Sequence, residues 1–370
     1  MNRSDFFAAN IKAQRRKRKM TQKEFADILG YSEKAVSKWE CGSGIPPIET
    51  LFEIARLFDT SIDGLFRADE RYYLAIDGGG TKTALLLADK DGKVIRSHRA
   101  PACNPVDVGF DKACEVLSTA IKEICGDIPL SEIILFAGIA GGTSAGMRER
   151  LQGFFEVLGF SAFENDSDNK NIIAAGLGDA DGISLILGTG ICAFVRKYGE
   201  YSRIAGWGYL VDAGGSGYNL GQDALNAYFS AYDGSGEPTL ISEEVDALHE
   251  GGVDAIMSYI YSEKKKAVAS FAPAIYKALE RGDEKAKRIL ERNMKVAANV
   301  AEAARKSFPD KKVVPLVLSG GLTDNPETLA YFRAALKDPD EFDIKILDRA
   351  PVYGALELAM KIKESESENA

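Results

Sequence analysis

The sequence contains only two histidines and five cysteines, and no two cysteines form a Cys-x-x-Cys pair. A structural zinc site draws its ligands mainly from Cys and His, so such a site is not expected. The scattered, odd-numbered cysteines favour free thiols in a reducing, cytoplasmic compartment over a disulfide framework. Long apolar runs are also missing, so the sequence predicts neither a membrane span nor a signal peptide.

Charge is divided unevenly along the chain. Residues 1–67, the head, carry 12 Lys and Arg against 9 Asp and Glu, whereas the remaining residues, the body, carry 34 against 46. A basic head on an acidic body is typical of a nucleic-acid-binding module joined to a domain that does not bind nucleic acid.

The head is predicted to form five short helices. Thr21 and Glu24 have the spacing of a capping box, and Gly30 ends the helix that they begin. Ser32 is placed to cap the next helix, roughly residues 33–40. Helical spacing assigns the following side chains to the core: Ala26, Ile28, Leu29, Val36 and Trp39.

Two helices joined by a tight turn form a helix-turn-helix unit, whose second helix enters the major groove of DNA. The basic run at residues 15–19 is placed next to the DNA backbone, although alone such a run is more often a solvated helix end. The residues predicted to contact DNA are Gln22, Ser32, Lys34, Ser37 and Lys38.

Residues 21–66 resemble the Cro/C1-type (XRE) helix-turn-helix family along their whole length. The most specific part of the match is Ala-Val-Ser-Lys-Trp-Glu, followed by the Gly, Pro and Glu-Thr-Leu positions of the family pattern. The resemblance implies a homodimer that binds a double-stranded DNA operator with two-fold symmetry.

The strongest chemical signal in the body is Asp-Gly-Gly-Gly-Thr-Lys-Thr at residues 77–83. Glycines let the backbone approach a ligand, and successive N–H groups in such a turn form an anion-binding concavity. Thr81, Lys82 and Thr83 add donors and charge, and Asp77 is placed to hold a hydrated Mg²⁺. The motif is not a Walker A sequence, and alone it would more often be a hairpin without a ligand.

Two further glycine-rich turns strengthen this interpretation. Leu-Gly-Thr-Gly at residues 187–190 repeats the same chemistry, and Leu-Ser-Gly-Gly-Leu at residues 318–322 is placed to accept an adenine or a ribose. Two glycine–threonine turns can grip one polyphosphate from opposite sides. The turns predict these nucleotide contacts: Gly78, Gly79, Gly80, Thr81, Lys82, Thr83, Gly188, Thr189, Gly190, Gly320 and Gly321.

On these motifs, residues 72–360 resemble the sugar kinase/Hsp70/actin superfamily, and more closely the N-acetylglucosamine kinase and BadF/BadG/BcrA/BcrD ATPase family. The resemblance implies an α/β fold: an all-α, five-helix head and a two-lobed, actin-like (ribonuclease H-like) body that uses ATP and Mg²⁺. We expect a linker near residues 67–71. Lobe I would span residues 72–182, completed by a helix at 352–366, and lobe II residues 183–351.

The resemblance also assigns roles to single residues. It places Ala272 on the nucleotide side and Asn104, Trp207 and Asp212 on the side of a small-molecule substrate, an amino sugar. Asp166 falls where the family keeps the carboxylate that accepts a proton from the sugar hydroxyl. Each of these residues alone would more often be a turn, packing or capping residue, and only their joint placement favours a site.

The sugar side departs from the family pattern. Ile191 and Cys192 follow the second turn, where the kinases usually carry small polar residues, and Asp212-Ala213 replaces an acidic pair. Loss of one buried polar contact costs ~1–3 kcal/mol, which is enough to change specificity without abolishing binding. Nucleotide binding is therefore a firmer expectation than phosphorylation of N-acetylglucosamine.

Three functions fit these observations in different degrees. The first is a transcription regulator whose body senses a sugar or a nucleotide, and the second is an active hexosamine kinase that also binds DNA. The third is an ATPase that activates a radical dehydratase, which would need an iron–sulfur cluster. Because the sequence shows no cluster motif and the head has no role there, we favour the first.

Overall fold

The computed structural model describes residues 3–66, 71–144 and 146–363, and it separates the head from the body as two compact units. Most of the predicted linker, residues 67–70, lies outside the described residues. So does the last part, 364–366, of the helix expected at 352–366. Within the described residues no helix combines the length and the apolar composition that a membrane crossing requires.

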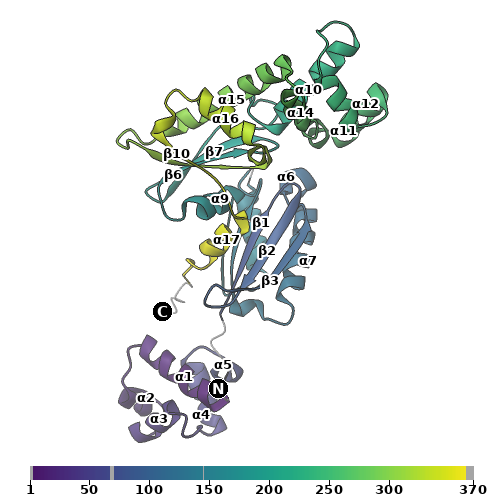
Figure 1. The fold of residues 1–370 in the computed structure, drawn as a ribbon. Coiled ribbons are helices and arrows are strands. Elements are labelled where there is room, and N and C mark those ends of the chain that lie inside the picture. Colours follow the sequence, from purple (N-terminus) through teal and green to yellow (C-terminus); the bar gives the residue numbers. More distant parts are fainter. Residues whose placement is uncertain (1–2, 67–70, 145, 364–370) are drawn as a thin grey trace. The chain divides into compact units, whose positions relative to one another are not determined.

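The head is all-helical, as the sequence predicts (Figure 1). Its elements are α1 (Arg3–Lys17), α2 (Gln22–Ile28), α3 (Glu33–Glu40), α4 (Ile48–Leu57) and α5 (Ile62–Phe66). The capping box at the start of α2 is present. The Thr21 hydroxyl accepts a hydrogen bond from the Glu24 N–H at 3.1 Å, and the Glu24 carboxylate accepts one from the Thr21 N–H at 2.7 Å.

The core of the head is built from apolar side chains of all five helices. Val36 and Trp39 of α3 are buried in it, as helical spacing predicts, and Gly30 ends α2 with a φ of +71°. The assignment of Ile28 to the core is wrong, because its side chain is 54% exposed. Ile28 is the last residue of α2, and there the helical repeat no longer decides which way a side chain points.

Lobe I of the body contains a five-stranded sheet in the order β3-β2-β1-β4-β5. Its strands are β1 (Tyr72–Gly78), β2 (Lys82–Ala88), β3 (Val94–Pro101), β4 (Ile133–Ile139) and β5 (Ala162–Asp166). Its helices are α6 (Pro105–Val108), α7 (Phe110–Cys125), α8 (Met147–Glu156) and α9 (Asp168–Leu177). Every residue of β4 is buried, as expected for a strand covered on both faces.

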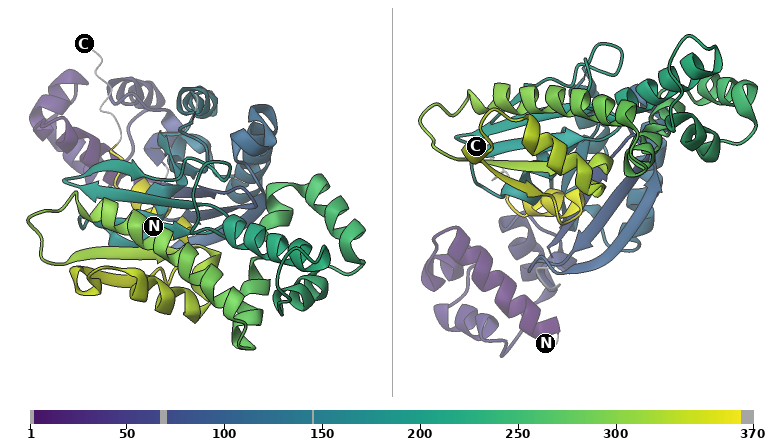
Figure 2. Two further views of the ribbon diagram at one scale, coloured as in Figure 1. Left: turned by 90° about the horizontal axis from the view of Figure 1, so that it is seen from above. Right: turned by 45° about the horizontal axis from the view of Figure 1, so that its top comes forward.

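Lobe II contains a second five-stranded sheet in the order β10-β9-β6-β7-β8. Its strands are β6 (Gly182–Leu187), β7 (Ile191–Lys197), β8 (Glu200–Ile204), β9 (Val314–Ser319) and β10 (Phe342–Ile346). Its helices are α10 (Gly217–Tyr232), α11 (Ile241–Leu248), α12 (Gly252–Glu263), α13 (Lys265–Ala269), α14 (Ala272–Glu280), α15 (Glu284–Arg305) and α16 (Pro326–Ala335). The long α15 lies along this sheet (Figure 2).

Both sheets contain an antiparallel hairpin with a glycine-rich turn, as the sequence predicts. In lobe I the hairpin pairs β1 with β2, so that Gly78 lies opposite Thr83. In lobe II it pairs β6 with β7, so that Leu187 lies opposite Ile191. The first two predicted phosphate turns therefore occupy equivalent places in two similar sheets.

Helix α9 contacts both sheets. It packs against β4 of lobe I and against β6 and β9 of lobe II, and the C-terminal helix α17 (Pro351–Ala359) packs on it. A Cβ atom on Gly176 of α9 would lie 2.6 Å from a methyl carbon of Val317 in β9, so this contact requires a residue without a side chain. Side chains at the start of α9 are thus placed by elements of both lobes.

Candidate functional site

The first glycine turn, residues 79–81, joins β1 to β2 and is closed by a hydrogen bond from Gly79 N–H to Lys82 O at 3.0 Å. A Cβ atom on Gly78 would lie 2.5 Å from the buried Cys103 Sγ, so the chain cannot pack here with a larger residue. Thr81 and Lys82 are exposed at the turn. The turn can therefore offer backbone N–H groups, a hydroxyl and a charge to an anion.

Thr83 does not share this exposure. Its side chain is fully buried, and its hydroxyl donates a hydrogen bond to the Pro101 carbonyl of the neighbouring strand at 2.7 Å. Thr83 is the second residue of β2, where successive side chains alternate between the two faces of the sheet, so it does not share the face of the exposed Lys82. The contact of Thr83 with phosphate stays a prediction, and in this structure its hydroxyl links β2 to β3.

Asp77 lies at the end of β1, just before the first turn. Burial raises the pKa of the Asp77 carboxyl to about 6. A hydrogen bond from Asn171 and the charge of Lys82 act in the opposite direction, whereas the Asp168 carboxylate adds to the rise. A divalent cation would stabilise the charged form of a partly desolvated carboxylate that lies near a second carboxylate.

The second turn, residues 188–190, docks onto the start of α10. The Gly188 carbonyl accepts a hydrogen bond from Gly217 N–H at 2.7 Å, and the Thr189 carbonyl accepts one from Tyr218 N–H at 3.1 Å. The Thr189 side chain is exposed. The backbone of this turn is thus fixed by lobe II, while its hydroxyl remains available to a ligand.

The third turn packs directly against the second. Gly320 has a φ of +101°, and a Cβ atom there would lie 2.6 Å from the carbonyl carbon of Leu187. Gly321 next to it is exposed and has open space around it. The structure thus brings two of the three predicted nucleotide turns together, in lobe II.

Ala272 lies at the first position of α14 and is buried in the core of lobe II. One turn further along the helix, the Tyr276 hydroxyl lies 2.8 Å from the Thr328 hydroxyl, which donates to the Leu322 carbonyl at 2.6 Å. Ala272 therefore belongs to a helix that is tied to the segment after the third turn.

Asn104 lies in lobe I close to the first turn. Its side-chain oxygen accepts a hydrogen bond from Val106 N–H at 3.0 Å, and its Nδ2 donates to Asp107 at 2.7 Å. A Cβ atom on Gly80 would lie 3.2 Å from the same Asp107 carboxylate. The predicted substrate asparagine and the first phosphate turn are therefore neighbours.

Trp207 and Asp212 belong to one exposed loop of lobe II. The Asp212 carboxylate accepts hydrogen bonds from the N–H groups of Trp207 at 3.1 Å and Gly208 at 3.0 Å. The Trp207 ring is 69% exposed and lies under the Arg203 guanidinium at 4.2 Å. Asp212 thus shapes the loop that presents Trp207 to solvent.

Asp166 is the last residue of β5 and is buried. Its carboxylate forms ion pairs with Arg148 at 2.5 Å and Lys170 at 2.7 Å. It also accepts a hydrogen bond from Ser167 N–H at 2.7 Å. Burial alone would raise the pKa of Asp166, but the contact with Lys170, the Ser167 N–H and the two positive charges lower it below its usual range.

A pocket of about 410 Å³ beside α8 and β5 includes Asp166, Arg148 and Lys170 in its lining, but none of the other predicted site residues. The structure therefore does not join Asp166 to the glycine turns through this pocket.

Asp168, which sequence reasoning did not select, lies two residues further on, at the start of α9. Burial raises the pKa of its carboxyl, against weaker hydrogen bonds from Ser167 and Asn169. Its negative charge contributes to the raised pKa of Asp77 in lobe I and of Cys192 beside the second turn in lobe II. The only sequence signal for it was a second Asp in Asn-Asp-Ser-Asp-Asn.

The residues around Asp77 fit a hydrated Mg²⁺. Burial raises the pKa of both the Asp77 and the Asp168 carboxyl, and the Asp168 charge adds to the rise at Asp77. No group of three or more His, Cys, Asp or Glu in the described part of the chain could hold a metal by itself. Mg²⁺ usually binds through one or two carboxylates, with waters and substrate phosphates completing its shell. Asp77 and Asp168 match this preference for one or two carboxylate ligands.

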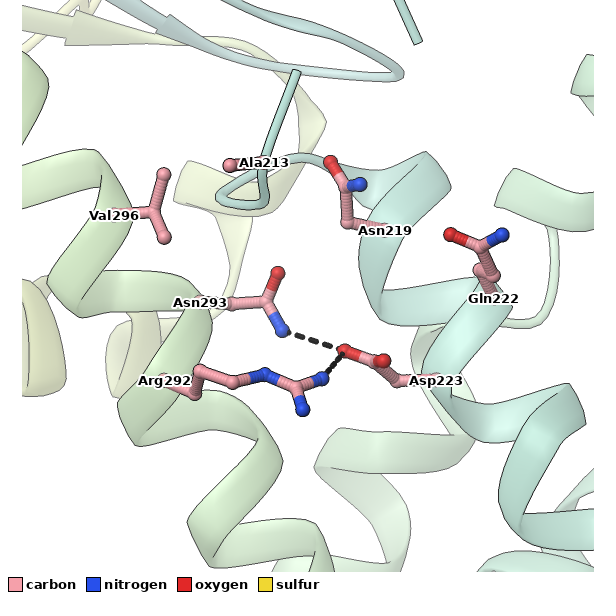
Figure 3. A pocket seen from close by; sticks show the side chains of 7 residues that line it. All are labelled: Ala213, Asn219, Gln222, Asp223, Arg292, Asn293 and Val296. Atoms are coloured by element: carbon pink, nitrogen blue, oxygen red, sulfur yellow. Dashed lines mark hydrogen bonds and ion pairs between the residues drawn. The ribbon is translucent and has the colours of Figure 1, made fainter. Parts of the chain in front are cut away.

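A separate polar pocket of about 90 Å³ lies between α10 and α15 in lobe II (Figure 3). There Asn293 donates a hydrogen bond to Asp223 at 2.8 Å, and Arg292 forms an ion pair with the same carboxylate at 2.5 Å. None of the predicted site residues lines this pocket. The one carboxylate in its lining, Asp223, is paired with both neighbours, so we assign no ligand to this pocket.

In the head, α3 separates core from surface as a DNA-reading helix requires. Val36 and Trp39 face inward, whereas Lys34 and Lys38 are exposed and Ser37 is half-buried. The Ser32 hydroxyl caps the helix by accepting a hydrogen bond from Ala35 N–H at 3.3 Å.

Two predicted DNA contacts also take part in contacts inside the head. Arg15 is buried, pairs with the Glu40 carboxylate at 2.5 and 2.9 Å and also donates to the Met20 carbonyl at 2.6 Å, so it is not part of the predicted backbone-binding run. Gln22 donates its side-chain N–H to Glu40 at 2.8 Å, which fixes the orientation of its amide. The contact of Gln22 with DNA stays a prediction.

Residues 74–359 match the model of the BadF/BadG/BcrA/BcrD ATPase family, and residues 11–65 match a helix-turn-helix model. Over 259 residues the chain is 30% identical to an N-acetylmuramic acid/N-acetylglucosamine kinase of Clostridium acetobutylicum, covering 67% of this chain and 81% of that relative. An N-acetyl-D-glucosamine kinase of Dictyostelium discoideum is 27% identical over 315 residues, covering 79% and 98%.

A solved structure from Chromobacterium violaceum, assigned as an N-acetylglucosamine kinase, shares the fold of the body. It has a TM-score of 0.65 at 23% identity and covers 79% of this chain and 100% of that one.

Proposed function

Because the chain belongs to the BadF/BadG/BcrA/BcrD ATPase family and carries an N-terminal helix-turn-helix domain, we propose that it is a cytoplasmic transcription regulator whose body binds Mg-ATP and an amino sugar. The observation that carries the nucleotide part is the pair of glycine–threonine hairpin turns, one in each sheet. The amino sugar is proposed from the named kinase relatives and from Asn104 beside the first turn.

The proposed nucleotide contacts come from three turns and one helix. The first turn and Lys82 would hold the phosphates from lobe I, and the second turn from lobe II. Gly320, Gly321 and Ala272 would contact the nucleoside side. Asp77 would hold Mg²⁺ through water and so supply positive charge between the phosphates. Thr83 is omitted, since its hydroxyl is used inside the sheet.

The regulatory part of the proposal is a homodimer whose heads bind the two halves of a symmetric operator. The predicted boundaries, with the head at 1–67 and the lobes at 72–182 and 183–351, describe the parts that would move. Sugar or nucleotide binding would change operator affinity by altering the spacing of the two heads.

A selection from random duplex DNA with the purified full chain, repeated with and without Mg-ATP and a panel of amino sugars, tests this. We expect a two-fold symmetric sequence whose affinity changes with ligand. No enrichment, or enrichment that is identical under every ligand condition, would contradict the regulatory role.

A second function, active hexosamine kinase, is favoured by two partly desolvated carboxylates, Asp166 and Asp168, where β5 leads into α9. The family resemblance points to Asp166 as the proton acceptor, and Asp166 stays the residue predicted from sequence. In the structure its carboxylate is already paired with Arg148 and Lys170. Asp168 has a raised pKa and no cation paired with it among the described residues, which suits a proton acceptor better.

Turnover assays of Asp166→Asn and Asp168→Asn over hexoses and hexosamines separate the two candidates. We expect the larger loss of sugar-stimulated ATP turnover in Asp168→Asn. A loss confined to Asp166→Asn would restore the assignment from the resemblance, and no sugar-stimulated turnover by the wild type would leave only the sensing role.

A further inference from the structure

Asn171 is a fully buried side chain of α9 that reaches the end of β1. Its Nδ2 donates a hydrogen bond to Asp77 Oδ1 at 2.7 Å, and longer contacts lead to the carbonyls of Gly138 at 3.3 Å and Ile76 at 3.4 Å. The amide therefore touches the last residues of two adjacent strands, and its shortest bond is to the carboxylate before the first turn.

The fold makes room for Asn171 at two glycines, one beside its side-chain amide and one beside its backbone carbonyl. A Cβ atom on Gly138 of β4 would lie 2.1 Å from Asn171 Oδ1, and a Cβ atom on Gly354 of α17 would lie 2.0 Å from the Asn171 carbonyl oxygen. Both distances are far below van der Waals contact. Two elements distant in sequence therefore depend on glycine in order to seat Asn171 at this position.

The environment of Asn171 is not what a packing residue requires. Its Oδ1 atom is buried without a hydrogen-bond partner among the described residues. A buried amide with an unpaired oxygen destabilises a fold relative to an apolar side chain of similar size. An asparagine at this position therefore points to a role for its Nδ2 group, which donates to Asp77.

We propose that Asn171 is a positioning residue that fixes the Asp77 carboxylate in the orientation that receives hydrated Mg²⁺. One carboxylate oxygen is anchored by the amide, so the direction of the other is determined. Asp168 is the first residue of α9, and Asn171 lies one turn further along the same helix. The helix that carries the Asp168 carboxylate therefore also orients the Asp77 carboxylate of β1. The inference rests on the proposed Mg-ATP site.

The chain offers a matched control in lobe II. Asn293 is also buried, and its Nδ2 donates to a carboxylate, Asp223, at 2.8 Å (Figure 3). Its Oδ1 accepts a hydrogen bond from Gly215 N–H at 2.9 Å, so it is fully paired. Removing either asparagine breaks a buried Asn–Asp bond, but only Asn171 touches the proposed metal site.

The experiment measures binding of a non-hydrolysable ATP analogue to the full chain by calorimetry, in excess Mg²⁺ and in EDTA. The readout is the ratio of the two dissociation constants, which reports how much Mg²⁺ strengthens binding. The variants are Asn171→Ala, Asp77→Asn, the double variant and Asn293→Ala. Groups that orient metal ligands typically contribute about 10- to 100-fold to metal affinity.

We expect Asn171→Ala to lower this ratio by at least about tenfold, and to have no further effect once Asp77 is replaced by Asn. Asn293→Ala should lower the melting temperature but keep the wild-type ratio. An unchanged ratio in Asn171→Ala, or effects of the two substitutions that simply add, would overturn the positioning role.

If Asn171→Ala does not fold, Gly138→Ala provides the second variant, because its methyl group would displace the amide while the amide itself is retained. It too should lower the ratio, and an unchanged ratio in a folded Gly138→Ala would overturn the inference. A wild-type chain that binds no nucleotide would contradict the proposed function. A wild type with clear Mg²⁺ dependence and unaffected variants would contradict only the role of Asn171.

Discussion

At the scale of single residues, the molecule depends on which polar groups find partners inside the fold. Asp166 and Asp168 are two residues apart in sequence, yet one is held by two cations and the other is not. In the head, Glu40 collects hydrogen bonds from both Arg15 and Gln22. These pairings decide which side chains remain available for a ligand.

The buried pair of Arg15 and Glu40 is predicted to matter for the stability of the head. Their side chains are 9% and 1% exposed, so replacing one partner leaves a desolvated charge. We expect Glu40→Gln to reduce the free energy of unfolding by about 3–5 kcal/mol, and Arg15→Met with Glu40→Leu to cost much less. Denaturation can be followed by Trp39 fluorescence in a Trp207→Phe background, since the chain has two tryptophans. Equal losses in the single and double variants would contradict this.

The same pair predicts a pH dependence with a definite sign. Burial alone would raise the pKa of Glu40, but the hydrogen bonds from Arg15 and Gln22 and the Arg15 charge lower it. A carboxyl with a lowered folded-state pKa contributes stability above its unfolded pKa, and this is lost as the pH falls through the folded value. Acid unfolding of the head should therefore shift to higher pH in Glu40→Gln. An unchanged acid midpoint would contradict the prediction.

At the scale of elements, the site depends on turns that are pressed against other backbone segments. The second and third turns of lobe II meet at Gly320, whose positive φ and lack of a side chain allow the contact with Leu187. Helix α9 fulfils a similar role between the sheets.

Gly320→Ala is expected to weaken Mg-ATP binding, because the added methyl group must push the third turn away from the second. Substitutions at strained or tightly packed positions typically cost about 1–3 kcal/mol, and a loss of this size in binding free energy would lower the affinity by roughly 5- to 150-fold. The control is Gly153→Ala in α8, where a Cβ atom meets nothing within 4 Å and φ is ordinary. Equal affinities of the two variants for Mg-ATP would show that the packing of these turns is irrelevant to binding.

Helix α3 carries the prediction for DNA. Lys34 and Lys38 are exposed on the side opposite the core, where contact with phosphates would release counterions. The double variant Lys34→Ala, Lys38→Ala should weaken binding across DNA sequences and reduce the slope of log affinity against log salt by about two. Lys122→Ala, on an exposed position of α7, is the control. An unchanged slope in the double variant would exclude these lysines from the interface.

Local sequence signals predicted the capping box, the five helices of the head and both glycine hairpins, because neighbours in the chain determine them. The bond between Asn171 and Asp77 spans 94 positions and could not be predicted in this way. Which of the two carboxylates, Asp166 or Asp168, is paired with cations depends in part on Arg148 of α8. The motif also could not predict that the Thr83 hydroxyl is buried and donates to the Pro101 carbonyl, because that bond joins two strands.

At the scale of the whole molecule, two similar sheets each provide a glycine–threonine hairpin, and a basic helical head precedes them. The proposed function requires that the body bind a nucleotide with both hairpins. Sensing, phosphoryl transfer and ligand-dependent DNA binding all depend on that common step.

Calorimetric titration of the full chain with a non-hydrolysable ATP analogue in Mg²⁺ tests this step most directly, with Thr81→Val and Thr189→Val as variants. We expect one nucleotide to bind per chain, with affinity lowered in each variant, since each removes one hydroxyl donor to the phosphates. Absence of binding in the wild type, or full affinity in both variants, would contradict it.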